Sequence, residues 1–247
     1  MAQHDAQRGG YRIGDRGFAF AAAHRAPCGP SAGQVHGHTF TVEVELVAPM
    51  LQAPGFVVDF AELAPVGEYL RSTLDHRDLD EVLPSVGNTD GIADHLSGWI
   101  GAHMPGPVAA SLDAVRVVTG DPAVLDAGVA HRVRFEAAHR LHGLPDGHKC
   151  ARLHGHSYMV DLRLHPDTGT VVRQRLSALV AEFIGERWDY QLLNDVVPVA
   201  PTSELLAREL HEQLAVLAGQ GDAAALAGVR VWESPRRWAE YTPGAVR

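Results

Sequence analysis

The feature that most constrains this chain is an internal repeat that carries a histidine motif in each copy. Phe20 precedes His24 by four positions, and Phe135 and His139 repeat that spacing roughly 115 residues later. A His-Gly-His sequence follows in each copy, at residues 36–38 and 154–156. Because such landmarks keep their order along the 247 residues, the sequence predicts a duplication with one unit at 1–127 and a second at 128–247.

Each half predicts the same order of elements, which is two strands, two helices and two strands. The segment 39–46, TFTVEVEL, alternates apolar and polar residues with the period of a strand. Helices on one face of an antiparallel sheet make an α+β fold, and the open sheet edges favour association into a barrel ring. Strands are expected at 11–23, 39–46, 131–138 and 157–164, final strand pairs within 115–125 and 229–240, and helices at 60–74, 92–103, 176–188 and 205–217.

Charge and composition exclude several classes of protein. The net charge of −9 argues against a general nucleic-acid binder, which needs a basic face. No apolar run approaches the roughly 20 residues that cross a membrane. Two cysteines do not make a disulfide framework, and the N-terminus lacks the features of a secretory leader. We therefore expect a cytoplasmic protein that binds neither nucleic acid nor membrane.

Histidines at ligand spacing indicate two metal sites. Residues two apart on a strand point to one face, so His154 and His156 should converge with His139 at the end of the neighbouring strand. Three imidazoles with an open fourth position form a plausible catalytic zinc site. The first half repeats this set with His24, His36 and His38. The remaining histidines are expected at the solvated surface: His4, His95, His103, His131, His142, His148, His165 and His211.

Several motifs of the second half resemble the 6-pyruvoyl-tetrahydropterin synthase family. They are FEAAHRL, Cys150-x3-His154-Gly-His156, a WDY stretch, a TSE helix start and VRVWE. The short spacing from cysteine to His-Gly-His looks like the bacterial 6-carboxy-tetrahydropterin synthases. The resemblance implies the tunnelling fold, a ring of ββααββ units with the helices outside, and zinc as cofactor. It also implies conversion of 7,8-dihydroneopterin triphosphate and water to 6-carboxy-tetrahydropterin, acetaldehyde and triphosphate, on the path to queuosine and other 7-deazapurines.

The resemblance also implies roles for individual residues. The zinc ligands would be the histidine triplets, His139, His154 and His156 foremost. Cys150 would be the thiolate general base. Glu233 would anchor the pterin by accepting two N–H bonds from its amidine edge, and Ser203 and Glu204 would help line the pocket. Candidates for holding the triphosphate are Lys149, Arg152 and Arg140.

The two halves depart from the family pattern in reciprocal ways. The family's triad is cysteine, aspartate and histidine, with the last two from a neighbouring subunit. The second half keeps the thiol and Glu233 but has Tyr190 after Asp189, whereas the first half keeps Asp75 and His76. We therefore expect a composite site in which the first half, of a neighbouring protomer or of the same chain, lends Asp75 and His76. Further departures are Ala32 at the cysteine position, Thr119 at the position of Glu233, Cys28 in a longer loop, and Arg173 where the first half has Asp59.

Other interpretations remain open. The first half is alternatively a decayed duplicate kept for assembly, with a structural zinc. The whole protein is alternatively a pterin- or purine-binding module without turnover, or a scaffold that assembles with an active relative. Tyr190 leaves room for altered chemistry such as aldolase-like side-chain cleavage. The expected homo-oligomer is either a pseudo-hexamer of three chains or a two-chain ring.

Overall fold

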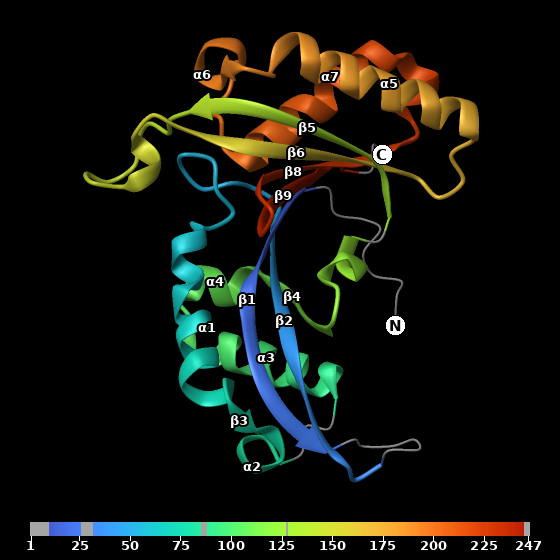
Figure 1. Cartoon of the computed structure of the whole chain (residues 1–247). Helices are drawn as coiled ribbons and strands as arrows, with labels where there is room; N and C mark the ends of the chain where they lie inside the picture. The colour runs from blue at the N-terminus through green and yellow to red at the C-terminus, as the bar shows by residue number, and fades with distance from the viewer. Residues whose placement is uncertain (1–9, 26–31, 85–87, 127, 245–247) are drawn as a thin grey trace. The chain divides into compact units, whose positions relative to one another are not determined.

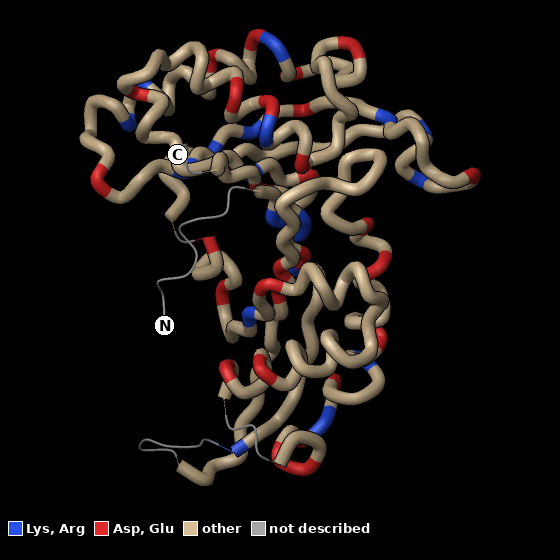
Figure 2. Tube along the Cα trace, turned by 180° about the vertical axis from the view of Figure 1, so that it is seen from behind, with Lys and Arg blue, Asp and Glu red and all other residues tan. Residues whose placement is uncertain are grey.

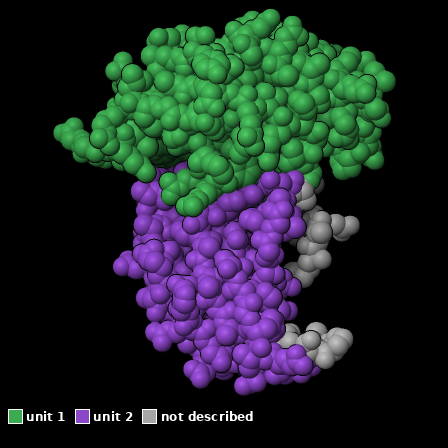
Figure 3. Space-filling model, viewed as in Figure 1, with its two compact units in different colours: residues 1–13, 48–57, 128–247 green, residues 14–47, 58–127 purple. Residues whose placement is uncertain are grey.

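The computed structural model describes residues 10–25, 32–84, 88–126 and 128–244, and the chain divides into two compact units (Figure 3). Unit 1 comprises Met1–Ile13, Ala48–Val57 and Gly128–Arg247, and unit 2 comprises Gly14–Val47 and Val58–Ala127. Unit 1 thus joins the second half of the chain to two short segments of the first half. The predicted repeat boundary near residues 127 and 128 stays a prediction, because the two units are defined by how compactly they pack and not by where a repeated sequence begins. Cys28 lies outside the described residues.

Unit 2 is built on long strands whose apolar residues alternate toward one face (Figure 1). Within Val35–Ala48 (β2), the side chains of Phe40, Val42 and Val44 are almost completely buried. β2 pairs antiparallel with β4, and β3 runs parallel to β1 at Ala22 and Ala23. The strands of this unit are β1 (Gly10–Arg25, which begins in unit 1), β2, β3 (Arg77–Asp78) and β4 (Leu112–Thr119).

The helices of unit 2 cover the apolar face of its sheet. Asn88 caps α3, because its side-chain oxygen accepts the Gly91 N–H at 2.9 Å. Leu96 and Ile100 of α3 are fully buried. The helical segments are 60–63 (3-10), α1 (Ala64–Tyr69), 70–74 (a π turn), α2 (Leu79–Val82), α3 (Thr89–His103), α4 (Gly106–Ser111) and 122–126 (3-10).

Unit 1 repeats this layout with a sheet in the order β9–β8–β6–β5–β7 and two long helices on one face (Figure 1). Leu206, Leu210 and Leu214 of α7 are fully buried in a core shared with α5 and the sheet. The elements are β5 (Val129–His139), a 3-10 turn at 149–151, β6 (His154–Leu164), α5 (Thr170–Arg187), β7 (Gln191–Leu192), α6 (Leu193–Val196), α7 (Ser203–Ala223), β8 (Leu226–Ser234) and β9 (Arg237–Thr242).

The sheet face of unit 1 opposite the helices holds charged groups that are paired. Asp161 is fully buried on β6 and accepts from the guanidinium of Arg132 at 2.5 and 2.7 Å and from the indole N–H of Trp232 at 2.7 Å. Arg230 donates to Glu240 at 2.9 Å. Such pairing offsets the cost of removing the charges from water. Acidic and basic positions are mixed along the trace of each unit (Figure 2).

The structure confirms most predicted elements and corrects one. The expected helix at 60–74 is helical throughout, but it consists of a 3-10 segment, α1 and a π turn in succession, with Pro65 in the first turn of α1, where a missing N–H is tolerated. The expected strand pair within 115–125 is wrong. One strand ends at Thr119, and Gly120, with φ +79°, leads into a 3-10 turn that begins at Pro122. Among the described residues, no helix combines the length and apolar character that crossing a bilayer requires.

Candidate functional site

Three histidines of unit 1 converge where β5 ends and β6 begins. His139 and His154 are directly opposite in the antiparallel pairing, and His156 follows two residues along β6 on the same face. The ring centroids lie 4.5, 5.2 and 4.9 Å apart, and the Nε2 atoms of His139 and His154 are separated by 3.1 Å. Two nitrogens bound tetrahedrally to one zinc ion lie about 3.3 Å apart, so this spacing fits shared ligation.

Backbone carbonyls fix the orientation of two of these rings. The Nδ1 of His139 bonds the carbonyl of Pro201 at 2.8 Å, and the Nδ1 of His154 bonds the carbonyl of Arg152 at 2.7 Å. A carbonyl oxygen can only accept, so each Nδ1 carries the proton and each Nε2 presents a lone pair to the centre. Burial lowers the pKa of His139 and of His156 below 6.5, which favours the neutral imidazole that ligates metals.

Buried nitrogen atoms without a hydrogen bond support a metal at both triads. The Nε2 atoms of His156 in unit 1 and His24 in unit 2 are buried and make no hydrogen bond. In each triad, one donor atom per histidine lies within 4.8 Å of the others. Zinc accepts imidazole nitrogens in this number and arrangement. The donor sets therefore fit a zinc ion at each site.

The triad of unit 2 repeats the geometry with less support from the backbone. The ring centroids of His24, His36 and His38 lie 4.4, 5.4 and 4.8 Å apart. The Nδ1 of His36 bonds the Gln34 carbonyl at 3.2 Å, which is longer than either bond in unit 1. Burial, followed by the neighbouring histidines, lowers the pKa of His24. Thr119 stands where the other half has a glutamate.

The predicted pterin anchor lies beside the triad of unit 1. Glu233 Oε1 is 3.3 Å from His156 Nε2, close enough for an ion pair although the two atoms do not form a hydrogen bond. Its other oxygen accepts from the hydroxyl of Ser203 at 3.3 Å. Ser203 and Glu233 are thus brought together. Glu204 is directed elsewhere, because its buried carboxylate accepts the backbone N–H of Val57 at 3.1 Å.

The half-buried Cys150 lies in the 3-10 turn that links β5 to β6. Its backbone N–H bonds the Nδ1 of His148 at 3.2 Å, and its carbonyl accepts from Leu141 N–H at 2.9 Å. Burial, then the nearby charges of Glu233 and Cys150, raises the pKa of Tyr158. The proposed triphosphate contacts are all exposed: Lys149, Arg152 and Arg140.

The predicted Asp75–His76 pair is formed in unit 2. Asp75 Oδ2 is 2.9 Å from His76 Nδ1, and its other oxygen accepts the Ala21 N–H at 2.8 Å. The Ala21 bond, followed by the His76 bond, lowers the pKa of Asp75. In unit 1, Asp189 makes the equivalent bond to the Glu136 N–H at 2.9 Å, and Tyr190 takes the place of His76.

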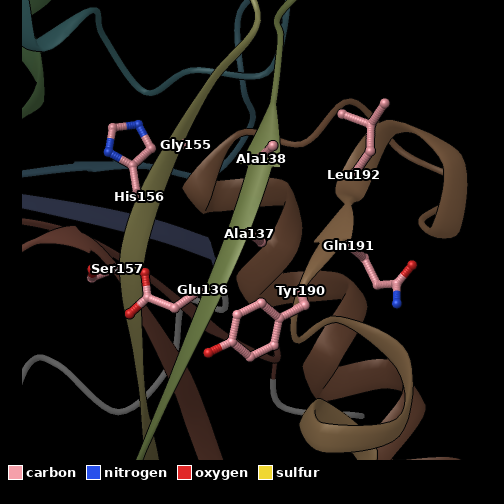
Figure 4. A pocket seen from close by; sticks show the side chains of 9 residues that line it. All are labelled: Glu136, Ala137, Ala138, Gly155, His156, Ser157, Tyr190, Gln191 and Leu192. Atoms are coloured by element: carbon pink, nitrogen blue, oxygen red, sulfur yellow. Dashed lines mark hydrogen bonds between the residues drawn. The ribbon is translucent and has the colours of Figure 1, made fainter.

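Both residues at this position stand in the left-handed region of backbone space. His76 has φ +56° and Tyr190 has φ +55°, and both side chains are 82% exposed. Each lines a shallow hollow, of about 480 Å³ in unit 1 and about 630 Å³ in unit 2. Figure 4 shows the unit 1 hollow, which is bounded by β5, β6 and the segment 190–192 and includes Tyr190, Glu136, Ser157 and His156.

Sequence reasoning missed one residue of the site and misplaced one histidine outside it. Tyr158 is buried beneath the triad, its ring centroid 5.4 Å from that of His156 and its hydroxyl without a hydrogen-bond partner. The strand alternation could have found it, because Tyr158 follows His156 by two residues. His211 was expected at the surface, and this is wrong. Its side chain is 8% exposed, because α7 turns it against Tyr241.

Comparison with curated proteins finds pterin enzymes. Over 75 residues the chain is 35% identical to the dihydroneopterin monophosphate aldolase of Pyrococcus furiosus, across 30% of this chain and 63% of the relative. Over 62 residues it is 39% identical to an Archaeoglobus fulgidus protein named, provisionally, as a 6-carboxy-5,6,7,8-tetrahydropterin synthase, across 25% of this chain and 53% of the relative. The chain thus matches less than two thirds of the length of either relative.

Solved structures of 6-pyruvoyl tetrahydropterin synthases are also similar. The Caenorhabditis elegans protein is 26% identical, across 46% of this chain and 92% of that chain, with a TM-score of 0.36. The Plasmodium falciparum protein is 12% identical, across 94% of this chain and 99% of that chain, with a TM-score of 0.25. Both TM-scores are low, so the assignment of this chain to a family rests on its sequence. The model of the family described as 6-pyruvoyl tetrahydropterin synthase matches residues 14–125 and again residues 128–244, and the chain therefore belongs to this family.

Proposed function

We propose that this protein is a zinc-dependent lyase that acts on the side chain of 7,8-dihydroneopterin triphosphate. The observation that carries the proposal is the position of Glu233, which lies 3.3 Å from the triad through His156 and holds Ser203 on its other oxygen. A carboxylate beside a three-histidine site can bind the pterin ring while the side chain reaches the metal position. Zinc at three imidazoles with a fourth position open supplies Lewis-acid chemistry toward hydroxyl and carbonyl groups.

The protein's own residues would bind the substrate and move its protons. Glu233 would accept two N–H bonds from the pterin amidine edge, and Ser203 would hold that carboxylate in position. The Cys150 thiolate would take a proton from the side chain. His76, on a neighbouring protomer or the same chain, would transfer the second proton, and Asp75 would fix its tautomer. Lys149, Arg152 and Arg140 would hold the triphosphate.

The expected reaction is conversion to 6-carboxy-tetrahydropterin, with acetaldehyde and triphosphate as the other products. This branch is supported by the short spacing between Cys150 and His154 and by the name of the Archaeoglobus relative. We place the reaction in the cytoplasm, on a path to 7-deazapurines such as queuosine. We propose a homo-oligomer, as a pseudo-hexamer of three chains or a two-chain ring.

Aldolase cleavage is the second candidate. It is favoured by Tyr190, which replaces histidine at an exposed position, and by the name of the Pyrococcus relative. A retro-aldol step breaks the bond between the first two side-chain carbons, which leaves a 6-hydroxymethyl pterin and a phosphorylated two-carbon aldehyde. A catalytically inactive pterin-binding or scaffold protein is the remaining alternative.

Product analysis separates these functions. Zinc-loaded protein is incubated with 7,8-dihydroneopterin triphosphate, the pterins are separated by chromatography and the aldehydes are identified. Acetaldehyde with the 6-carboxy product supports the synthase, and a phosphorylated aldehyde supports the aldolase. Saturable quenching of pterin fluorescence without turnover supports a binding protein, and the absence of both supports a scaffold.

Variant kinetics test the composite site. Cys150→Ala and His76→Ala should each abolish turnover, and mixing the two inactive variants under reassembly should restore part of it if the pair is shared between chains. His103→Ala removes an exposed histidine of the same unit and serves as control. Wild-type turnover in His76→Ala would rule out the composite site. Cys28→Ala should retain activity, unless the longer loop supplies a working thiol.

A further inference from the structure

The segment Ala48–Val57, which we name the strap, belongs to the first half of the sequence but is part of unit 1. It closes on itself, because Gln52 and Phe56 exchange backbone hydrogen bonds of 2.8 and 2.9 Å. The Gly55 N–H also donates to the Gln52 carbonyl at 2.7 Å. The strap is therefore a shaped loop that presents its last residues, Gly55 to Val57, to a neighbouring element.

That neighbouring element is the beginning of α7. The Thr202 hydroxyl donates to the carbonyl of Gly55 at 3.0 Å and accepts the N–H of Leu205 at 3.3 Å. A single hydroxyl thus caps the helix and binds the strap. The Val57 N–H donates to the Glu204 carboxylate at 3.1 Å. Thr202 and Glu204 are 1% and 2% exposed, so loss of either strap bond leaves a buried polar group without that partner.

The fit between the strap and α7 is tight at Gly55. A Cβ at this position would lie 2.5 Å from Cδ1 of Leu205 and 3.1 Å from Oγ1 of Thr202. Its φ of +135° is also a backbone conformation that residues with a side chain rarely adopt. Any larger residue would press on the side chains of Leu205 and Thr202 and would strain the backbone at this φ.

The same short segment, 201–204, contacts the candidate site. The carbonyl of Pro201 accepts from His139 of the metal triad at 2.8 Å, and the hydroxyl of Ser203 donates to Glu233 at 3.3 Å. Thr202 and Glu204 thus bond the strap, whereas Pro201 and Ser203 bond the site. A shift of this segment would move the ring of His139 and the carboxylate of Glu233 together.

We propose that the strap is a positioning element for the pterin site, through which the first half of the chain sets the geometry of the second. Gly55, Thr202 and Glu204 are its positioning residues. This assigns Glu204 to the support of the pocket rather than to contact with the ligand. The inference rests on the proposed function for the identity of the ligand, while the mechanical coupling of strap and helix stands on the contacts alone.

The test compares Gly55→Ala and Thr202→Val with two controls. Thr202→Ser retains the hydroxyl. Gly219→Ala alters another glycine of positive φ, at +70° on α7, where a Cβ meets nothing within 4 Å. Binding of 7,8-dihydroneopterin to the full-length, zinc-loaded protein is measured by fluorescence titration. With zinc in excess, we expect Kd to rise about tenfold or more in Gly55→Ala and Thr202→Val, and we expect wild-type affinity in both controls. Wild-type affinity in Gly55→Ala and Thr202→Val would overturn the proposal.

Hydrogen exchange separates failure of this inference from failure of the proposed function. The amides of Leu205 and Leu206, which bond the hydroxyl and the carbonyl of Thr202, should exchange faster in Gly55→Ala, which leaves that hydroxyl in place, but not in Gly219→Ala. If the wild-type protein binds no pterin, the proposed function fails. Hydrogen exchange then shows by itself whether the strap holds the start of α7. Unchanged exchange in Gly55→Ala would show that the strap does not hold the helix start.

Discussion

Burial changes the acid–base behaviour of His211 in a way that should make the metal-free protein sensitive to pH. Burial is the main cause that lowers the pKa of His211 below 6.5. A group with a lowered pKa in the folded state contributes stability above its unfolded pKa, and the contribution is lost as pH falls through the folded value. The depressed pKa values of His24, His139 and His156 act in the same direction when no metal is bound.

The first prediction therefore concerns acid stability. Between pH 7.5 and pH 5.5, the Tm of metal-free protein should fall, and it should fall less in His211→Gln than in the wild type. Each pKa unit corresponds to about 1.4 kcal/mol, and each kcal/mol to about 2–4 °C for a chain of this size. Differential scanning calorimetry measures this difference. The exposed His165 is the control, since His165→Gln should reproduce the wild-type fall. An equal fall in His211→Gln would contradict the prediction.

At the scale of elements, the sheet of unit 1 depends on a buried charge. Asp161 on β6 ties β5 to β8 through Arg132 and Trp232, with none of its surface exposed. A second pair of this kind joins α5 to α7. The guanidinium of Arg175 on α5 donates to the two carboxylate oxygens of Asp222 on α7 at 2.6 and 2.7 Å, and the Arg175 side chain is largely exposed. The two pairs are alike in chemistry and differ in burial.

The second prediction compares these pairs by substitution. Asp161→Asn should lower the free energy of unfolding by about 2 kcal/mol, because a fully buried carboxylate loses its charge-assisted bonds to Arg132, whose side chain is 32% exposed. Asp222→Asn should lower it by less than about 1 kcal/mol, because solvent screens the exposed pair. Urea unfolding followed by circular dichroism gives both values. Similar losses in the two variants would show that burial does not set the value of the Asp161 pair.

Local patterns predicted the strands and triads but could not predict contacts between distant segments. Alternation in 39–46 and the spacing of His154 and His156 depend on neighbours in sequence, and both were confirmed as geometry. The helical run 60–74 was also predicted from local spacing, although its change from 3-10 to α to π hydrogen bonding was not. The docking of Gly55 against Leu205 could not be predicted, because 150 positions of sequence separate them and only tertiary packing brings them together. For the same reason, the direction of Glu204 was not predictable.

For the whole molecule, the two triads predict two metal ions per chain with unequal affinity. In unit 1, two of the three rings are held by carbonyl groups at 2.7 and 2.8 Å, whereas among the described residues of unit 2 one such contact is made, by His36, and it is longer at 3.2 Å. Orienting bonds of this kind typically change metal affinity by about 10–100-fold. The site in unit 1 should therefore retain its ion longer.

The third prediction is a ratio of two zinc ions per chain, and His24→Ala and His139→Ala should each reduce it to one. Stepwise addition of a chelator should empty the unit 2 site first, so that His139→Ala loses its remaining ion at a lower chelator concentration than His24→Ala. Elemental analysis after gel filtration gives the ratio. Equal retention in the two variants would refute the ranking of the sites, and a single ion in the wild type would refute the count.

The exposed position shared by His76 and Tyr190 has a consequence for how such a chain diverges. The backbone N–H of each residue donates to a strand carbonyl, that of Ala21 in one half and that of Glu136 in the other, and neither bond involves the displayed side chain, although the His76 ring also contacts Asp75. Replacing that side chain therefore costs the fold little. A duplicated gene can alter the chemistry at this position in one copy by a single codon, while the other copy preserves the original group. Fusion of the two copies in one chain keeps both versions present in equal number.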